Sequence, residues 1–239
     1  MKVFAATSKG PHKIENEDRI VINRTILSEG SYYEDFDSGL IAIADGVGGN
    51  NAGSVASHFV VNKISELEII TQAALMRINE DLLKLSKTSE SLSGMATTLS
   101  GLTINSESIN AFHVGNTRIY ILIADKYLNQ VTVDDTIVNY LLKSGQITQN
   151  DFAFHQLKNE ITACFGGGSL SLLKLSFIPN LGFGTFLLTT DGVHDFLTDD
   201  EIETILVSYN DNYPEACSVL IGLARANGSM DDASVVVVG

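Results

Sequence analysis

The chain has 239 residues, of which 44% are hydrophobic and 18% charged, which is typical of a soluble chain with one large or two small globular domains. Lys and Arg total 15 against 29 Asp and Glu, and the formal net charge of -14 argues against nucleic acid or an anionic membrane as the main partner. Two cysteines without CxxC spacing, and no apolar run long enough for a signal peptide or a membrane span, predict a reducing compartment, the cytoplasm.

The N-terminal third is expected to contain three strands before its first helix. Short apolar runs predict strands over 3–7 and 19–23, and the polar, Ser- and Asp-rich stretch 28–38 reads as an irregular insertion. A buried strand over 40–44 ends on Asp45, and a glycine-rich turn follows before a helix begins near Ala52.

Apolar residues at helical spacing then predict two amphipathic helices, within 55–67 and 75–85. From residue 96 the residue pattern becomes typical of β-structure. Four short runs typical of strands, separated by turn-like residues, predict an antiparallel meander that reaches residue 133. The segment 134–168 is mostly polar and ends in glycines, which is typical of a long functional loop or flap, with a short helix over 137–142.

The remainder alternates strands and helices. Strands are predicted over 170–178 and 184–190, and helices over 199–207, capped by Thr198, and over 214–226. A last strand is predicted over 233–238. With no linker or repeat, we expect one α+β domain over 1–239, in which sheets pack on each other and helices cover the outside.

Acidic residues adjoin four of the predicted strands. An isolated Asp-Gly pair is most often only a tight turn. Here Asp45 and Asp191 each end an apolar run and precede a glycine, while the pairs 17–18 and 231–232 each precede a strand. Such a set could converge at one end of a sheet, where cations would have to neutralise it. Carboxylate oxygens favour Mg²⁺ or Mn²⁺.

Six motifs occur in order along the chain: NED at 16–18, DGVGG at 45–49, GMATT at 94–98, GNTR at 115–118, TDGVHD at 190–195 and GSMDDAS at 228–234. Each is weak alone. Together they resemble the motifs of the metal-dependent PP2C (PPM) serine/threonine protein phosphatases, in particular the compact bacterial type.

This resemblance implies a β-sandwich of two antiparallel sheets flanked by pairs of helices, with two Mn²⁺ or Mg²⁺ ions at one end. It implies hydrolysis of phosphoserine and phosphothreonine by a hydroxide held between the ions, on a protein substrate phosphorylated by a Ser/Thr kinase, in a monomer. By motif, Asp45 would bridge both ions, and the remaining ligands would be Glu17, the Gly46 carbonyl, Asp191 and Asp231.

Two further positions are assigned through the resemblance. Asp18 would act behind the metal ligands, and Lys13 stands where the family has a phosphate-binding Arg. A lysine offers a point charge but no bidentate fork, so weaker phosphate binding is expected. The alternative for a loop lysine is a solvated surface charge. Asn50, where bacterial relatives often have His, puts a proton-donating role there in doubt.

The third ion found in many bacterial relatives would lie at Asn116, Asp191 and Asp195. Because Asn116 replaces an Asp, we expect this position to be empty or weakly occupied. Alternatively, Asn116 only fills a turn. The departures at Lys13 and Asn116 also leave open a pseudophosphatase that acts as a regulatory binding module.

Overall fold

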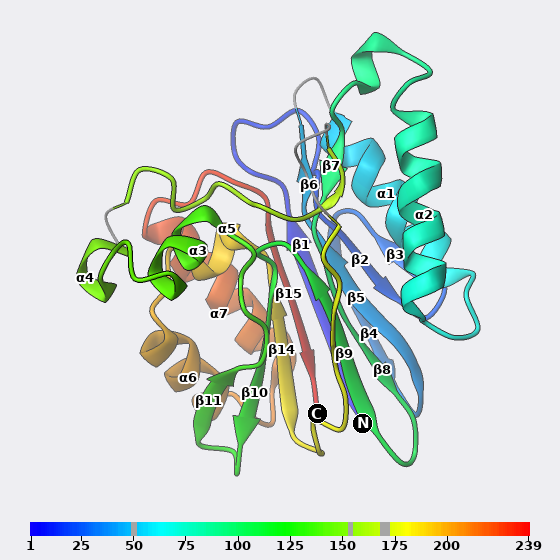
Figure 1. Ribbon diagram of the computed structural model, residues 1–239. Coiled ribbons are helices and arrows are strands. Elements are labelled where there is room, and N and C mark those ends of the chain that lie inside the picture. The colour runs from blue at the N-terminus through cyan, green and yellow to red at the C-terminus, as the bar shows by residue number, and fades with distance from the viewer. Residues whose placement is uncertain (49–51, 153–154, 168–172) are drawn as a thin grey trace.

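The computed structural model describes residues 1–48, 52–152, 155–167 and 173–239, so Asn50 lies outside the described residues. Two six-stranded antiparallel sheets face each other (Figure 1). The first sheet has the spatial order β11 (Tyr127–Gln130), β10 (Arg118–Ile123), β14 (Thr185–Thr189), β15 (Ala233–Val238), β1 (Lys2–Ser8) and β4 (Gly30–Asp35). The second has the order β13 (Ser176–Ile178), β9 (Ile109–Val114), β8 (Leu99–Ile104), β5 (Gly39–Ala44), β2 (Arg19–Ile22) and β3 (Thr25–Leu27).

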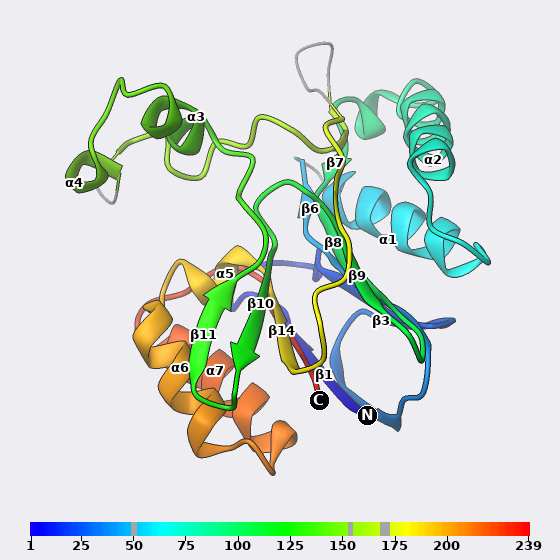
Figure 2. The ribbon, with the colours of Figure 1, turned by 60° about the horizontal axis from the view of Figure 1, so that its bottom comes forward.

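Helices cover the outer face of each sheet, as Figures 1 and 2 show. The pair α1 (Ala52–Ser65) and α2 (Gln72–Leu85) packs on the second sheet, and the pair α6 (Asp199–Ser208) and α7 (Tyr213–Ala226) packs on the first. Every residue of β15 is buried, because Val236 and Val238 face the interior between the sheets while Val235 and Val237 face α7. This confirms the α+β sandwich expected from the sequence.

Two sequence predictions were wrong. The stretch 28–38 contains strand β4, which pairs with β1, and Tyr32 packs against the interior between the sheets. The strands from 96 to 133 do not form one meander. The hairpin β8–β9 belongs to the second sheet and β10–β11 to the first, so the chain changes sheets between Val114 and Arg118. Alternating burial in a local stretch cannot reveal such a crossing.

The other predicted helices and strands are present, with small shifts at their ends. The strand expected over 170–178 is described only as β13, since residues 168–172 lie outside the described part and 173–175 are not in a strand. The N-cap of α6 is Thr198, as expected, and its hydroxyl and the Glu201 carboxylate form a reciprocal capping box.

One end of the sandwich carries additional short elements. A three-stranded sheet of β6 (Gly46–Val47), β7 (Ala96–Thr97) and β12 (Phe165–Gly166) lies beside α1, and α5 (Asp191–His194) follows β14. A 3-10 turn, η1 (Glu90–Leu92), precedes β7. The helices α3 (Ile137–Lys143) and α4 (Gln149–Phe152) project away from both helical layers (Figure 2).

The two termini lie together at the opposite end of the sandwich (Figure 1). Strands β1 and β15 are antiparallel neighbours. The backbone amide of Lys2 donates to the carbonyl of Gly239 at 2.6 Å, and the amide of Gly239 donates to the carbonyl of Lys2 at 3.0 Å. Lys2 and Gly239 are therefore held next to each other by antiparallel backbone hydrogen bonds.

Candidate metal centre

The strands of both sheets bring the acidic residues to the same end of the sandwich. In the second sheet, β5 ends there and the antiparallel β2 begins there. In the first sheet, β14 ends and β15 begins there. The acids that follow or precede these strands are Glu17, Asp18, Asp45, Asp191, Asp231 and Asp232. The convergence expected from the sequence is thus what the topology produces.

The backbone at Asp45 is fixed by two threonines of the GMATT motif. The Asp45 amide donates to Thr98 Oγ1 at 2.9 Å, and Thr97 Oγ1 donates to the Asp45 carbonyl at 2.9 Å. The Thr98 amide donates to the same carbonyl at 2.9 Å. These hydrogen bonds hold the end of β5 rigid, so the backbone position from which the Asp45 side chain extends is fixed.

Two glycines let the NED loop, β6 and the start of α1 approach closely. A Cβ on Gly46 would lie 2.2 Å from the Gly53 carbonyl oxygen, and a Cβ on Gly53 would lie 2.6 Å from Glu17 Oε1. No side chain larger than hydrogen fits at either position. The pair brings Glu17 beside the Gly46 backbone, the two groups that the resemblance assigns to one ion.

Asp18 and Asp232 organise the loops rather than facing the cleft. Asp18 is buried, and its Oδ2 accepts hydrogen bonds from Thr190 Oγ1 at 2.8 Å and Ser234 Oγ at 2.6 Å. Asp232 accepts from the Gly10 amide at 2.8 Å and the Glu17 amide at 2.7 Å. Both carboxylates therefore join segments from the two ends of the chain.

The ammonium group of Lys13 lies among three of the acids. Its Nζ is 2.6 Å from Asp231 Oδ1, 3.1 Å from Glu17 Oε2 and 3.2 Å from Asp232 Oδ2. Burial lowers the pKa of Lys13, but the hydrogen bond to Asp231 and the charges of Asp231 and Asp232 outweigh burial and raise it above its ordinary value. Lys13 is therefore a partly buried cation of the cleft and not a solvated surface charge.

The carboxylates around the cleft are hard to ionise together. Burial, with the charge of Asp231 next, raises the pKa of Asp191 to about 6, and burial raises that of Asp18 to about 8. Burial and the charge of Asp191 raise the pKa of Asp45 well above its ordinary value. Like charges held in a poorly solvated site favour protonation, and a bound cation removes that preference.

Two buried oxygens support a cation as the missing partner. Among the described residues, no hydrogen-bond donor group reaches Glu17 Oε1 or Asp191 Oδ1, and both oxygens are shielded from solvent. The Asp45 carboxyl lies within hydrogen-bond reach of the Asp191 carboxyl, so the two acids compete for one proton. Buried carboxylate oxygens are rarely left without a donor, because the desolvation cost is large. Among residues 1–48, 52–152, 155–167 and 173–239, no three His, Cys, Asp or Glu side chains are already spaced to hold one ion. The oxygen-only donor set fits a hard divalent ion, with side chains that must adjust, including Lys13.

The position assigned to a third ion is held by hydrogen bonds from within the protein. Asn116 is buried, and its Nδ2 donates to Asp191 Oδ2 at 3.0 Å. Asp195 Oδ2 lies 3.9 Å from Lys158 Nζ, and the Asn159 side chain also hydrogen-bonds to Asp195. Asn116 therefore presents its amide hydrogens, rather than its oxygen, to Asp191.

Sequence reasoning gave no role to several residues that shape the centre. Thr190 and Ser234 hold Asp18 in place, and their positions beside acids in two of the motifs could have indicated this role.

The role of Arg225 on α7 could not be predicted from the sequence. Its Nη1 donates to the carbonyls of Ser229, at 3.1 Å, and of Asp231, and its Nη2 donates to the Ser8 carbonyl at 3.0 Å. It thereby fixes the loop that carries Asp231.

Three comparisons place this geometry among known proteins. Residues 31–218 match the family model described as Protein phosphatase 2C. The curated Serine/threonine phosphatase stp of Listeria monocytogenes is 28% identical over 97% of this chain and 93% of its own length. The crystal structure of the serine/threonine phosphatase PstP/Ppp of Mycobacterium tuberculosis superposes with a TM-score of 0.82 at 27% identity, over 99% of this chain and 98% of that one.

A further structure shows what a similar protein holds. The catalytic domain of the serine threonine protein phosphatase PstP, solved in complex with two manganese ions, has a TM-score of 0.74 at 27% identity. The alignment covers 99% of this chain and 98% of that one.

The crowded acids predict a pH-dependent effect of metal on stability. Burial raises the pKa of Asp18 and Asp191 above the ordinary 3.8, so the metal-free fold binds more protons than the unfolded chain. This contribution is full below about pH 4 and is lost as the pH rises through the folded values, about 6 and 8. We expect Mn²⁺ to raise the melting temperature, and the increase to be larger at pH 8 than at pH 5.5.

Thermal denaturation with and without Mn²⁺ at both pH values measures this increase. Asp191→Asn should reduce it, whereas Asp81→Asn, which removes an exposed acid on α2, should not. An increase of equal size at both pH values, or an equal reduction in both variants, would contradict the prediction.

Proposed function

Since the chain belongs to the protein phosphatase 2C family, we propose that it hydrolyses phosphoserine and phosphothreonine in proteins, with divalent metal ions bound among the acids at the end of the sandwich. The observation that carries the proposal is the convergence of acids from both sheets, two of whose buried oxygens accept no hydrogen bond from any donor group in the described part of the chain. The named relatives are serine/threonine phosphatases, so the comparisons favour an enzyme over the pseudophosphatase alternative.

The proposed ligands are those that the family motifs assign and the fold brings together. Asp45 would serve both ions, Glu17 and the Gly46 carbonyl one of them, and Asp191 and Asp231 the other. The pair of Mn²⁺ ions in the PstP structure supports two ions, Mn²⁺ or Mg²⁺, here. When bound, two divalent ions activate water for in-line attack and stabilise negative charge on the phosphoryl oxygens.

Lys13 is the proposed phosphate-binding side chain. In the absence of metal its ammonium group screens Glu17, Asp231 and Asp232. Metal ions would take over that neutralisation and leave the ammonium group available to the substrate phosphate. Lysine binds phosphate as a point charge, so orientation of the monoester depends more on the other residues of the cleft than it would with an arginine.

Asp18 is proposed as a positioning residue. Its carboxylate joins Thr190, next to Asp191, to Ser234, next to the loop of Asp231. Because Asp18 is adjacent to Glu17 in sequence, one buried side chain sets the relative position of ligands from three segments. It needs no contact with substrate for this role.

The biological setting is proposed on chemical grounds. The substrate is a phosphoprotein, and a Ser/Thr kinase is the enzyme class that forms it. A cytoplasmic location is supported by the low cysteine content, and the protein is proposed to be a monomer. No helix in the described part of the chain is long and apolar enough to cross a membrane.

We propose that the segment 134–168 acts as a flap, since Lys158 and Asn159 reach Asp195.

Removing a ligand charge tests the metal-dependent reaction. Asp45→Asn, Asp191→Asn and Asp231→Asn should each lower kcat with Mn²⁺ by about 100-fold or more, because each weakens metal binding. Hydrolysis of p-nitrophenyl phosphate and of a phosphothreonine peptide provides the measurement. Asp81→Asn is the matched control. Full turnover by Asp45→Asn, after chelation and reconstitution with Mn²⁺, would falsify the proposed function.

Lys13 has its own kinetic signature. Lys13→Ala should raise KM about tenfold and lower kcat less, because a contact with the ground-state phosphate is lost. Lys13→Arg should match or exceed wild type through bidentate contacts. Steady-state kinetics at low salt provides the measurement, with Lys63→Ala on α1 as the control. Identical constants for Lys13→Ala and wild type would remove Lys13 from phosphate binding.

The third position is proposed to be empty or weakly occupied in wild type. Asn116→Asp should create or tighten a third site, because a carboxylate replaces an amide that donates to Asp191. Calorimetric titration with Mn²⁺ should then show one more binding event than in wild type. Asn129→Asp, on the exposed strand β11, adds the same charge elsewhere and should not. Three ions in wild type, unchanged in Asn116→Asp, would contradict this.

A further inference from the structure

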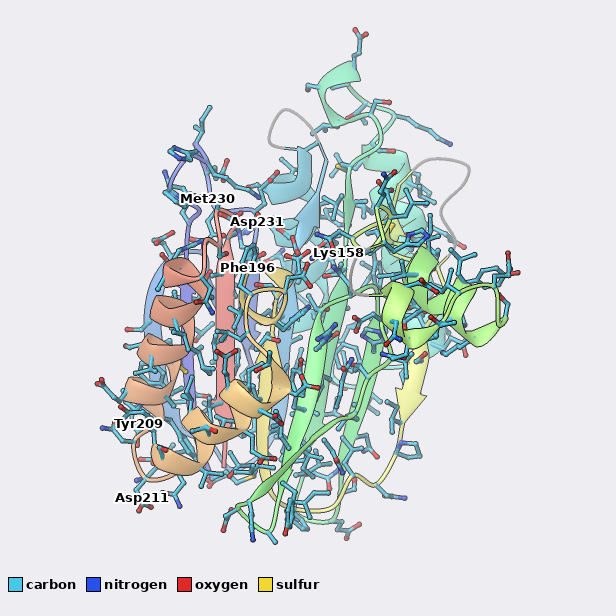
Figure 3. All side chains as sticks on the ribbon, turned by 90° about the vertical axis from the view of Figure 1, so that its left-hand side faces the viewer. Lys158, Phe196, Tyr209, Asp211, Met230 and Asp231 are labelled. Carbon is cyan, nitrogen blue, oxygen red and sulfur yellow. The ribbon has the colours of Figure 1, made fainter. Side chains whose placement is uncertain are left out.

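The acids share their cleft with two large apolar side chains. The cleft has a volume of about 330 Å³ and is lined by Lys13, Asp191 and Asp231 together with Phe196, Gly228 and Met230. This volume is at the lower end of ligand sites and mixes charged with apolar walls. Figure 3 shows Met230, Asp231, Phe196 and Lys158 gathered in one region, far from Tyr209 and Asp211 at the other end of α6.

Met230 is held in an exposed position by its neighbours. Its side chain is 56% exposed, although it lies between buried Ser229 and the proposed ligand Asp231. Arg225 bonds to the carbonyls of both neighbours, and Ser229 Oγ donates to the Gly192 carbonyl at 2.7 Å. The backbone is therefore fixed, and Met230 lines the cleft. A flexible, polarisable methionine adapts to different apolar partners.

Phe196 is placed with similar rigidity. It follows α5, which carries Asp191, and its carbonyl accepts a hydrogen bond from Asn227 Nδ2 at 2.9 Å. Its side chain packs against the core beneath α6 and α7 but is only partly buried, and Phe196 lines the same cleft as Met230. Two apolar side chains from separate loops thus lie on rigid backbone beside the proposed metal ligands.

The remaining lining does not give this apolar region a strong charge. Asp195 lies 3.9 Å from Lys158 Nζ and is hydrogen-bonded by Asn159, so its charge is partly compensated. Gly228 has no side chain, and a Cβ there would meet nothing within 4 Å. The space beside Met230 is therefore open.

We propose that Phe196 and Met230 form a subsite for an apolar side chain directly beside the phosphorylated residue of the substrate. The inference rests on the proposed phosphatase function. Continuity supports this occupant, because the cleft that holds the apolar pair is also lined by Lys13, Asp191 and Asp231. A peptide with its phosphate among these three residues has its neighbouring side chains within reach of the pair.

The test compares phosphothreonine peptides that differ at one position. Leu, Ala or Glu is placed immediately before or immediately after the phosphothreonine, and kcat/KM is measured with Mn²⁺. At one of the two flanks we expect Leu to exceed Ala and Glu by about tenfold, the size of effect that a few buried methylenes produce. Hydrolysis of p-nitrophenyl phosphate should not depend on the subsite, since that substrate has no flanking residue.

Two variants assign the preference to the subsite. Met230→Ala shortens the side chain, and Met230→Gln keeps its length but makes it polar. Both should reduce the Leu-to-Ala ratio of kcat/KM to about threefold or less. Because the ratio is taken within one protein, a general loss of turnover or of metal cancels. Met76→Gln, an exposed methionine on α2, should keep the wild-type ratio.

The outcomes separate this inference from the proposed function. Hydrolysis of all peptides within about twofold at both flanks would overturn the subsite and leave the phosphatase intact. A Leu preference that persists in both Met230 variants would also overturn it. Absence of hydrolysis of every peptide and of p-nitrophenyl phosphate would overturn the phosphatase and the subsite together.

Discussion

Repulsion between carboxylates in one poorly solvated cleft is the constraint on which the rest of this structure depends. Burial, together with the charges of neighbouring acids, raises the pKa of Asp45 and Asp191 in the cleft and of Asp18 behind it. Lys13 offsets part of the charge of Asp231, and Asn116 donates a hydrogen bond to Asp191. Among the described residues, Glu17 Oε1 and Asp191 Oδ1 accept no hydrogen bond from a donor group, and a bound cation would satisfy them.

Hydrogen bonds between distant segments keep the repelling groups together. Asp18 and Ser234 are 216 residues apart in sequence, and Asp232 binds the amides of Gly10 and Glu17. Each sheet contributes acids, so the two sheets must keep their relative position for the acids to stay together. The buried side chains between the sheets and the hydrogen bonds at the end of the sandwich therefore both maintain the arrangement of the acids.

The fold class, most helices and strands and the convergence of acids could be predicted from the sequence, because these follow from apolar periodicity and from motifs. The change of sheet after Val114 could not be predicted, because it depends on long-range strand pairing. Strand β4 was also missed, since a polar edge strand resembles a loop. At the site, Lys13 could be identified by position, but its contacts with three acids could not. In the described part of the chain, Arg225 hydrogen-bonds to backbone carbonyls and to the Ser229 hydroxyl, and such a role cannot be recognised from the local sequence.

The paired termini have a consequence for engineering. Strands β1 and β15 begin and end side by side, at the end of the sandwich opposite the acids (Figure 1). A short peptide linker could join Gly239 to Met1, and new ends could be opened in an exposed loop such as the one after Ile123. A circular permutant of this kind would keep both sheets in their present order. A reporter domain attached at residue 1 or residue 239 would stand clear of the cleft and of any phosphoprotein bound there.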